Sequence, residues 1–272
     1  MLKVIYSDSQ GVPATDRGLA YGDGLFETIR MCGRRAVLRR HHLNRMVSDA
    51  NRLGIGVDYV NLNHQLSRAA ERLAPAGESG WWILKLILTR GSGGRGYRPP
   101  KSSEPTLIVS AAALPPLPAS DGVVARCASF PLTVNPRLAG IKTLNRLEQV
   151  MASREFTGTE WELIMTDLSG HLVEGTRTNL LARVGNEWVT PPVSAIAVAG
   201  VMRQFAMETL MTAGEAIAER SLPQDIASLS GLRGLYLLNS VFGAVPVREL
   251  DSVNLPVDRT LATICLPLET LE

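Results

Sequence analysis

Amines that could act as nucleophiles are few in this chain. Of its 28 basic residues only four are lysines, and the other 24 are arginines. Lys142 precedes a predicted helix in IKTLNRLEQV, which places its side chain at the junction of two elements beside Ile141 and Leu144. Apolar neighbours favour the neutral, nucleophilic form of an amine. Lys142 is therefore the candidate nucleophile, and a buried lysine with a purely structural role is the alternative.

Three further features could bind an anionic ligand that contains a ring. Glu174 lies in LVEGTRTN, where a strand enters a glycine turn, and an exposed turn carboxylate is the alternative. Arg45 lies at the polar edge of a predicted helix, although arginines at such edges are usually solvated. Gly200 precedes another predicted helix, so the amides of Val201 and Met202 could bind a phosphate, as any helix N-terminus could. Together with a reactive lysine, these groups match the needs of pyridoxal phosphate.

A glycine-rich segment, RGSGGRGY, follows a predicted strand and contains the spacing G-x-G-x-x-G. A dinucleotide-binding fingerprint needs a helix directly after the glycines, but the next residues are YRPP, and consecutive prolines cannot continue a helix. Two interpretations remain. The segment is either a loop that places Arg90, Arg95 and Tyr97 over a cleft, where guanidinium groups bind carboxylates, or a solvated hairpin loop.

Composition excludes several classes of protein. The 272 residues carry a formal net charge of +2, with 45% apolar and 20% charged residues, which is typical of a globular protein and not of a nucleic-acid binder. The three cysteines lie far apart and the four histidines lack metal-ligand spacing. No apolar run approaches the roughly 20 residues that a membrane span requires. We therefore expect a soluble, cytoplasmic protein without a metal, nucleic-acid or membrane partner.

Two domains are expected to position these residues. Apolar periodicity predicts a helix that ends at Gly54, and strands at 25–31, 81–89 and 106–113 complete an α+β domain over residues 1–113. The proline-rich stretch at 114–122 is interpreted as a linker.

Residues 123–272 form the second domain, in which short strands alternate with helices after Lys142 and Gly200. The helix after Lys142 is expected to carry an apolar set of Leu144, Leu147, Val150 and Met151. A cleft between two such domains would bind a small molecule.

The segments YGDGLFETIR, HHLNRM, IKTLNRLEQV, LVEGTRTN and GVMRQ resemble, in the same order, the branched-chain and D-amino-acid aminotransferase superfamily, the class-IV or fold type IV pyridoxal phosphate enzymes. The resemblance covers nearly the whole chain. It implies a two-domain α+β/α/β fold with pyridoxal 5′-phosphate in the interdomain cleft. It assigns the Schiff-base lysine to Lys142, the carboxylate at the pyridine nitrogen to Glu174 and the phosphate-binding arginine to Arg45. The amides of Val201 and Met202 would complete the phosphate site.

The same resemblance adds two cofactor contacts and an assembly state. Ser240, in LLNSVFG, falls where the family supplies another phosphate contact, and Asn145 falls among residues near the ring. The ring-hydroxyl tyrosine of the aminotransferases has no obvious counterpart here. A homodimer is expected, as in the family.

Two longer segments, ILTRGSGGRGY and NPRLAGIKTLNRLEQV, resemble the branch of lyases that convert 4-amino-4-deoxychorismate into 4-aminobenzoate and pyruvate in folate synthesis. This resemblance implies that Arg95, with Tyr97 or Arg90, binds the substrate carboxylates and that Thr28 assists proton transfer to the leaving group. An aminotransferase of the same fold is the alternative function. A catalytically silent small-molecule binder is the remote one.

Overall fold

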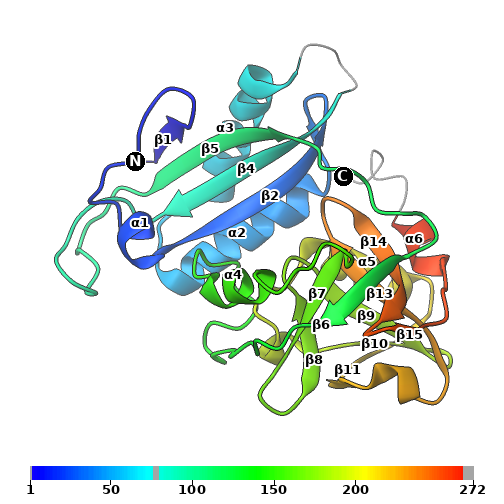
Figure 1. Ribbon diagram of the computed structural model, residues 1–272. Coiled ribbons are helices and arrows are strands. Elements are labelled where there is room, and N and C mark those ends of the chain that lie inside the picture. Colours follow the sequence, from blue (N-terminus) through cyan, green and yellow to red (C-terminus); the bar gives the residue numbers. More distant parts are fainter. Residues whose placement is uncertain (1, 76–79, 266–272) are drawn as a thin grey trace. The chain divides into compact units, whose positions relative to one another are not determined.

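The computed structural model describes residues 2–75 and 80–265, which form two compact units (Figure 1). Of the described residues, the first unit contains those up to Pro115 together with Lys142–Asn145, and the second contains Pro116–Ile141 and residues 146–265. The division falls inside the stretch predicted as a linker. The short segment with Lys142 belongs to the first unit, although the sequence placed it in the C-terminal domain.

A five-stranded sheet forms the first unit, in the order β1-β5-β4-β2-β3. Strands β1 and β5 are parallel and the other pairs are antiparallel. The elements of this unit are β1 (Lys3–Tyr6), α1 (Arg17–Tyr21), β2 (Gly24–Cys32), β3 (Arg35–Ala36), α2 (Arg39–Leu53), α3 (Tyr59–Leu73), β4 (Trp81–Thr89) and β5 (Thr106–Ala113).

Helices α2 and α3 lie behind this sheet in Figure 1. Alternation along β2 buries Leu25, Glu27 and Ile29 and leaves Phe26 and Thr28 half-buried, because successive side chains of a strand point to opposite faces. Helix α2 ends where the sequence predicts, since its C-cap glycine adopts a left-handed conformation (φ 65°).

A mixed sheet of ten strands forms the second unit, in the order β11-β10-β9-β13-β14-β6-β7-β8-β12, with β15 paired to β14. Its strands are β6 (Val123–Cys127), β7 (Glu162–Thr166), β8 (His171–Gly175), β9 (Asn179–Val184), β10 (Glu187–Thr190), β11 (Ala216–Glu219), β12 (Leu222–Pro223), β13 (Leu232–Asn239), β14 (Gly243–Leu250) and β15 (Val253–Asn254). Its α-helices are α4 (Leu147–Ser153), α5 (Val201–Thr212) and α6 (Thr260–Ile264), with short 3₁₀ turns at Val193–Ala195 and Ile226–Ser228.

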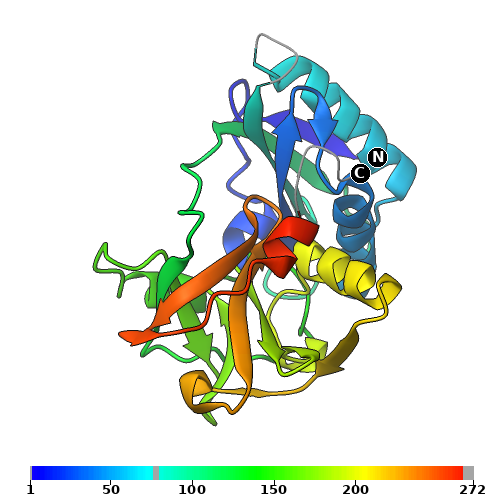
Figure 2. The same ribbon diagram turned by 90° about the vertical axis from the view of Figure 1, so that its right-hand side faces the viewer.

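The core of the second unit lies along its central strands. Leu180 and Ala182 of β9 pack with Leu235 and Leu237 of β13 in one buried cluster. Helix α5, yellow in Figure 2, and helix α6, red, lie side by side. In the described ranges of the chain, no helix is both long enough and apolar enough to cross a membrane.

Helix α4 departs from the expected packing. Leu147 and Val150 are 72% and 55% exposed, whereas Gln149 and Ala152 of the same helix are buried. Two residues of the expected apolar set therefore lie on the exposed side of the helix. The helix also begins only at Leu147, so Leu144 lies in the segment before it.

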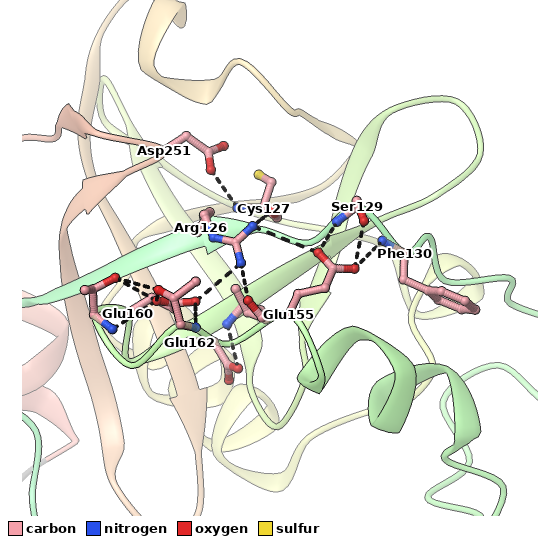
Figure 3. Close-up of polar contacts among 11 residues, drawn as sticks. Arg126, Cys127, Ser129, Phe130, Glu155, Glu160, Glu162 and Asp251 are labelled. Carbon is pink, nitrogen blue, oxygen red and sulfur yellow. Dashed lines mark hydrogen bonds and ion pairs between the residues drawn. The ribbon is translucent and has the colours of Figure 1, made fainter.

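A polar network fixes the end of β6, from which the chain runs toward Lys142 (Figure 3). The Glu155 carboxylate accepts hydrogen bonds from the backbone amides of Ser129 and Phe130 at 2.7 and 3.0 Å. Arg126 donates to the Glu155 carbonyl oxygen at 2.5 Å and to Glu160 at 3.4 Å. These contacts hold a segment without regular secondary structure in one conformation.

Candidate active site

The backbone of Lys142 is held on both sides within the first unit. Its amide donates to Oδ2 of Asp49 at 3.0 Å, and its carbonyl oxygen accepts from the amide of Phe26 at 3.1 Å. The next residue, Thr143, forms an antiparallel bridge with Leu25. The segment therefore adds to the edge of β2, and the direction in which the lysine side chain leaves the backbone is fixed.

Asp49 is buried on helix α2, with 6% of its surface exposed. Burial raises the pKa of its carboxyl, although the Lys142 amide and the nearby charge of Arg45 oppose the shift. An acceptor in this position satisfies a backbone amide that would otherwise be buried without a partner. Helix α2 thus contributes directly to the placement of Lys142.

The amine of Lys142 lies over an aromatic ring. Its Nζ is 4.2 Å from the centroid of the Phe26 ring, and Nζ of Lys85, on β4, is 5.5 Å from the same centroid. Thr28 pairs directly with Lys85 across β2 and β4. Two amines therefore lie near one aromatic side chain, and Phe26 and Thr28 share the face of β2 opposite to Glu27, which contacts α2.

Arg45 is held by a buried carboxylate. Its Nε and Nη2 donate to Oε1 and Oε2 of Glu27 at 2.8 and 2.6 Å, and Nδ1 of His42 lies 2.6 Å from Oε2. Glu27 is 2% exposed and His42 is fully buried. Burial alone would raise the pKa of Glu27, but Arg45 and His42 lower it to about 2. The carboxylate is therefore ionised.

The Arg90 guanidinium is hydrogen-bonded to other parts of the first unit, although a substrate-binding role was expected of it. Its Nε and Nη2 donate to the two carboxylate oxygens of Asp23 at 2.8 and 3.0 Å. Nη1 and Nη2 also donate to the carbonyl oxygens of Gly54 and Leu53, each at 2.7 Å. Because the guanidinium ties the end of α2 to Asp23, its contacts are structural, and we do not retain it as a substrate ligand.

The glycine-rich loop between β4 and β5 contains no helix, and Arg17 fixes part of it. Nη1 and Nη2 of Arg17 donate to the carbonyl oxygens of Gly96 and Tyr97 at 3.1 and 2.9 Å. The Tyr97 side chain, 86% exposed, packs edge-on against Tyr21. Arg95 is exposed and forms no ion pair within the described part of the chain. The loop therefore combines an anchored backbone with an accessible guanidinium.

Asn145 is the last residue of the short segment that begins at Lys142. Its Nδ2 donates to the Gly22 carbonyl oxygen at 3.1 Å. A Cβ on Gly22 would lie 2.3 Å from the Asn145 amide oxygen, and Gly22 adopts the left-handed conformation that glycine favours (φ 67°). This contact ties the segment to the end of α1. The cofactor contact expected of Asn145 stays a prediction.

Glu174 lies in the second unit on β8 and is 3% exposed. It pairs with Met165 of β7, and its Oε2 accepts a hydrogen bond from the Val198 amide at 3.1 Å. Val198 belongs to the loop that leads into helix α5. One side chain therefore connects strand β8 with the loop that leads to a helix N-terminus.

Helix α5 begins after Gly200, which offers no side chain to cap it. The amides of Val201 and Met202 belong to the first turn, where an α-helix has no preceding carbonyl to pair with. A Cβ on Gly200 would lie 1.9 Å from Oδ1 of Asn179, whose Nδ2 donates to the Val198 carbonyl oxygen at 2.8 Å. Asn179 and Gly200 therefore fix the shape of this helix N-terminus.

The turn that follows Glu174 is built on a second carboxylate. Glu162 of β7 is fully buried and accepts from the hydroxyls of Thr176 and Thr178 at 2.6 and 2.9 Å and from the Arg177 amide at 3.3 Å. Burial raises the pKa of Glu162, and the Thr176 hydrogen bond and the Arg177 charge oppose that shift. Glu162 thereby holds the GTRT turn beside Glu174.

Ser240 lies at the turn between β13 and β14 and is 9% exposed. The preceding side chain forms the turn, because Oδ1 of Asn239 accepts from the amides of Val241 and Phe242 at 3.0 and 2.9 Å. These two hydrogen bonds of Asn239 stabilise the backbone conformation of the turn. The phosphate contact expected of Ser240 stays a prediction.

Each unit carries groups that pyridoxal phosphate requires. The first unit holds an amine on a fixed backbone and a fixed guanidinium, at Lys142 and Arg45. The second unit holds a buried carboxylate and an uncapped helix N-terminus whose glycine excludes a Cβ, at Glu174 and Gly200. The donor set fits a phosphate and a pyridine nitrogen.

Glu27, His42 and Asp49 also lie at the candidate site and were not predicted from the sequence. A signal for them was present, because His42, Arg45 and Asp49 are spaced by three and four residues and share one face of α2. Glu27 interrupts the buried face of an apolar strand, where a charge needs a partner. Leu43, Met46 and Ala50 of the same helix are buried as well, and apolar periodicity predicts only the packing of such residues.

Residues 24–250 match the family model for amino-transferase class IV, and the chain belongs to this family. The crystal structure of a 4-amino-4-deoxychorismate lyase from Pseudomonas aeruginosa is similar, with a TM-score of 0.87 and 36% sequence identity over 94% of both chains. An aminodeoxychorismate lyase from Vibrio harveyi is 29% identical over 91% of this chain and 90% of its own length. A putative branched-chain-amino-acid aminotransferase from Methanocaldococcus jannaschii is 29% identical over 88% of this chain and 83% of its own length.

Proposed function

We propose that this chain is a pyridoxal-phosphate-dependent lyase that converts 4-amino-4-deoxychorismate into 4-aminobenzoate and pyruvate. The observation that carries the proposal is the fixed position of Lys142. Its backbone amide and carbonyl oxygen are both hydrogen-bonded within the first unit, and its amine lies over the Phe26 ring. The 36% identity to a lyase of this name over 94% of both chains supports the choice of reaction.

The cofactor would be held by residues of both units. Arg45 and the amides of Val201 and Met202 would bind its phosphate, because a guanidinium and a helix N-terminus both favour an anion. Glu174 would accept a hydrogen bond from the protonated pyridine nitrogen. Ser240 would add a hydroxyl contact to the phosphate. The expected cleft between the domains is part of this proposal.

Lys142 would both carry the cofactor and move a proton. Pyridoxal phosphate, when bound, supplies an electron sink for the pair left behind when a C–H bond of an amine-bearing carbon breaks. The neutral amine of Lys142 removes the proton from ring carbon C4 of the substrate as a general base. The C3–O bond then breaks, its electron pair leaves with the enolpyruvyl oxygen, and the ring becomes aromatic. The enolate that leaves takes up a proton at its methylene carbon to become pyruvate, and Thr28 is the proposed donor.

Arg95, together with Tyr97, is the proposed ligand of the substrate carboxylates. Its guanidinium is exposed, on a loop whose backbone Arg17 anchors, so it can reach a ligand without losing a structural contact. We expect Arg95→Ala to lower kcat/KM by about tenfold, which corresponds to one charged hydrogen bond. Arg98→Ala, on the same loop and also exposed, is the matched control. Unchanged KM and turnover in Arg95→Ala would remove this role.

An aminotransferase is the second candidate, and the similarity to the putative aminotransferase from M. jannaschii favours it. Both reactions begin with removal of a proton by the lysine and differ in the next bond change. Purified holoenzyme should therefore be given authentic 4-amino-4-deoxychorismate without any keto acid, and pyruvate should be followed by a coupled assay. The lyase predicts pyruvate and 4-aminobenzoate in equal amounts. Absence of both products, with amino transfer to an added keto acid, would establish the aminotransferase instead.

A silent binder on the same scaffold has a simpler test. A holoenzyme absorbs near the edge of the visible range, and a preparation that stays colourless after incubation with pyridoxal phosphate would favour the binder. The homodimer, the cytoplasmic location and the place in folate and 4-aminobenzoate synthesis belong to the same proposal and stay predictions.

A further inference from the structure

The Glu27, His42 and Arg45 side chains form a buried polar cluster that no step of the proposed reaction uses directly. Glu27 comes from β2, and His42 and Arg45 come from consecutive turns of α2. The exposed fractions of the three side chains are 2%, 0% and 9%. A charged carboxylate that is removed from water in this way needs strong partners, and it has two.

The protonation states within the cluster follow from its hydrogen bonds. Because the Glu27 carboxylate is ionised, both of its oxygens can only accept. Nδ1 of His42, 2.6 Å from Oε2, must therefore carry the proton and donate it. Burial lowers the pKa of His42, so the ring is neutral and its Nε2 carries no proton. That Nε2 is buried and has no hydrogen-bond partner among the described residues, in keeping with the absence of a donor hydrogen on it.

The cluster fixes the orientation of Arg45. The two hydrogen bonds from Nε and Nη2 engage one edge of the guanidinium plane in the bidentate geometry that is specific to arginine. A long side chain that is ordered before its ligand arrives does not lose that rotamer freedom on binding. His42 in turn prevents the Glu27 carboxylate from rotating away from the arginine.

We infer that Glu27 is a positioning residue for Arg45, that His42 holds Glu27 in place through its Nδ1 hydrogen, and that both act on the binding of the cofactor phosphate. This inference rests on the proposed phosphate-binding role of Arg45. It assigns function to two residues that would touch neither the substrate nor the cofactor.

Glu27→Gln is the informative variant, because an amide presents an NH₂ group to either Arg45 or His42, and both of these are donors. The apoenzyme should be titrated with pyridoxal phosphate and, separately, with pyridoxal, which lacks the phosphate. We expect the variant to bind pyridoxal phosphate about tenfold or more weakly and pyridoxal within about twofold of the wild type. A disturbed fold would weaken both ligands alike, and that result would overturn the inference.

His42 supplies a matched pair of variants that does not depend on the folding of Glu27→Gln. The Asn amide nitrogen can occupy the place of Nδ1, whereas that of Gln corresponds to Nε2. His42→Asn should therefore retain the wild-type preference for pyridoxal phosphate over pyridoxal, and His42→Gln should lose several-fold of it. Equal losses in the two variants would contradict the role given to the Nδ1 hydrogen.

Arg45→Ala separates this inference from the proposed function. If Arg45→Ala loses the preference for pyridoxal phosphate and Glu27→Gln in that background loses nothing more, Glu27 acts through Arg45. If Arg45→Ala loses the preference but Glu27→Gln alone does not, only the positioning role is wrong. If Arg45→Ala keeps the preference, the phosphate assignment of Arg45 is wrong, and the inference falls with it.

Discussion

Lys142 and Arg45 of the first unit and the proposed phosphate-binding amides of the second unit are held by different means. In the first unit, charged side chains hold the site residues, since Glu27 binds Arg45 and Asp49 binds the amide of Lys142. In the second unit, the proposed phosphate-binding atoms are backbone amides, and the shape of the helix N-terminus depends on Gly200 fitting against Asn179. The first arrangement is sensitive to charge and pH, and the second is sensitive to added volume.

This difference has a structural cause. Lys142 and Arg45 have long, flexible side chains that need partners to adopt one conformation. Backbone amides of a helix are already rigid, so only their local packing needs to be preserved. Substitutions should therefore act on the two units through different physical effects.

Lys142→Ala should have the largest effect, because it removes the proposed general base and the amine that would carry the cofactor. We expect turnover to fall by about 10³-fold or more, the scale of a lost general base. Lys101→Ala, an exposed lysine in the glycine-rich loop region, should leave turnover unchanged. Product formation is measured for both variants after saturation with cofactor. Retention of activity in Lys142→Ala would show that the backbone hydrogen bonds of Lys142 serve only the fold.

Gly200→Ala should act on the second unit through volume alone. The new Cβ would collide with Oδ1 of Asn179, so the helix N-terminus must shift. We expect affinity for pyridoxal phosphate to fall by about tenfold with little dependence on pH. Gly56→Ala is the control, since nothing lies within 4 Å of a Cβ at that position. Equal cofactor affinity in Gly200→Ala and wild type would contradict the sensitivity to added volume that is proposed for the second unit.

Asp49 tests the charge dependence of the first unit, with a smaller effect. Its pKa is raised in the folded protein above the ordinary value of 3.8, so the free energy it contributes to stability is fully present below that value and is lost as pH rises through the folded-state pKa. Asp49→Asn keeps an acceptor without the charge. Its free energy of unfolding should exceed that of the wild type at neutral pH, and the difference should disappear on acidification.

Asp49→Ala is the matched variant, because it removes the acceptor as well as the charge. Leaving the Lys142 amide unpaired should cost about 1–3 kcal/mol of stability. Urea denaturation at several pH values measures both variants. A gain in the stability of Asp49→Asn that grows on acidification would contradict the account of this carboxylate.

The local elements of the fold could be predicted from the sequence. Periodicity placed the strands Trp81–Thr89 and Thr106–Ala113 and the end of α2 at Gly54 where the structure has them. These patterns are local, because a strand or helix shows its buried face within a few residues. The exposed Leu147 and Val150 of α4 are the exception, since an apolar spacing does not reveal which face is covered.

The partners of the site residues could not be predicted in the same way. Asp49 and Lys142 are separated by 93 positions, and Arg90 and Asp23 by 67. An arginine in a glycine-rich segment looks the same in sequence whether a carboxylate of the fold already binds it, as with Arg90, or leaves it exposed, as with Arg95. The type and position of a residue are visible in sequence, but whether its hydrogen-bonding capacity is already used depends on distant contacts.

The most direct test is to find which residue carries the cofactor. Holoenzyme is reduced with borohydride, digested with trypsin and analysed by mass spectrometry. The assignment of the cofactor to Lys142 predicts that the reduced cofactor lies on this residue and blocks cleavage there, which gives the peptide LAGIKTLNR. A reduced cofactor on Lys85, or cleavage at an unmodified Lys142 with the label elsewhere, would contradict it.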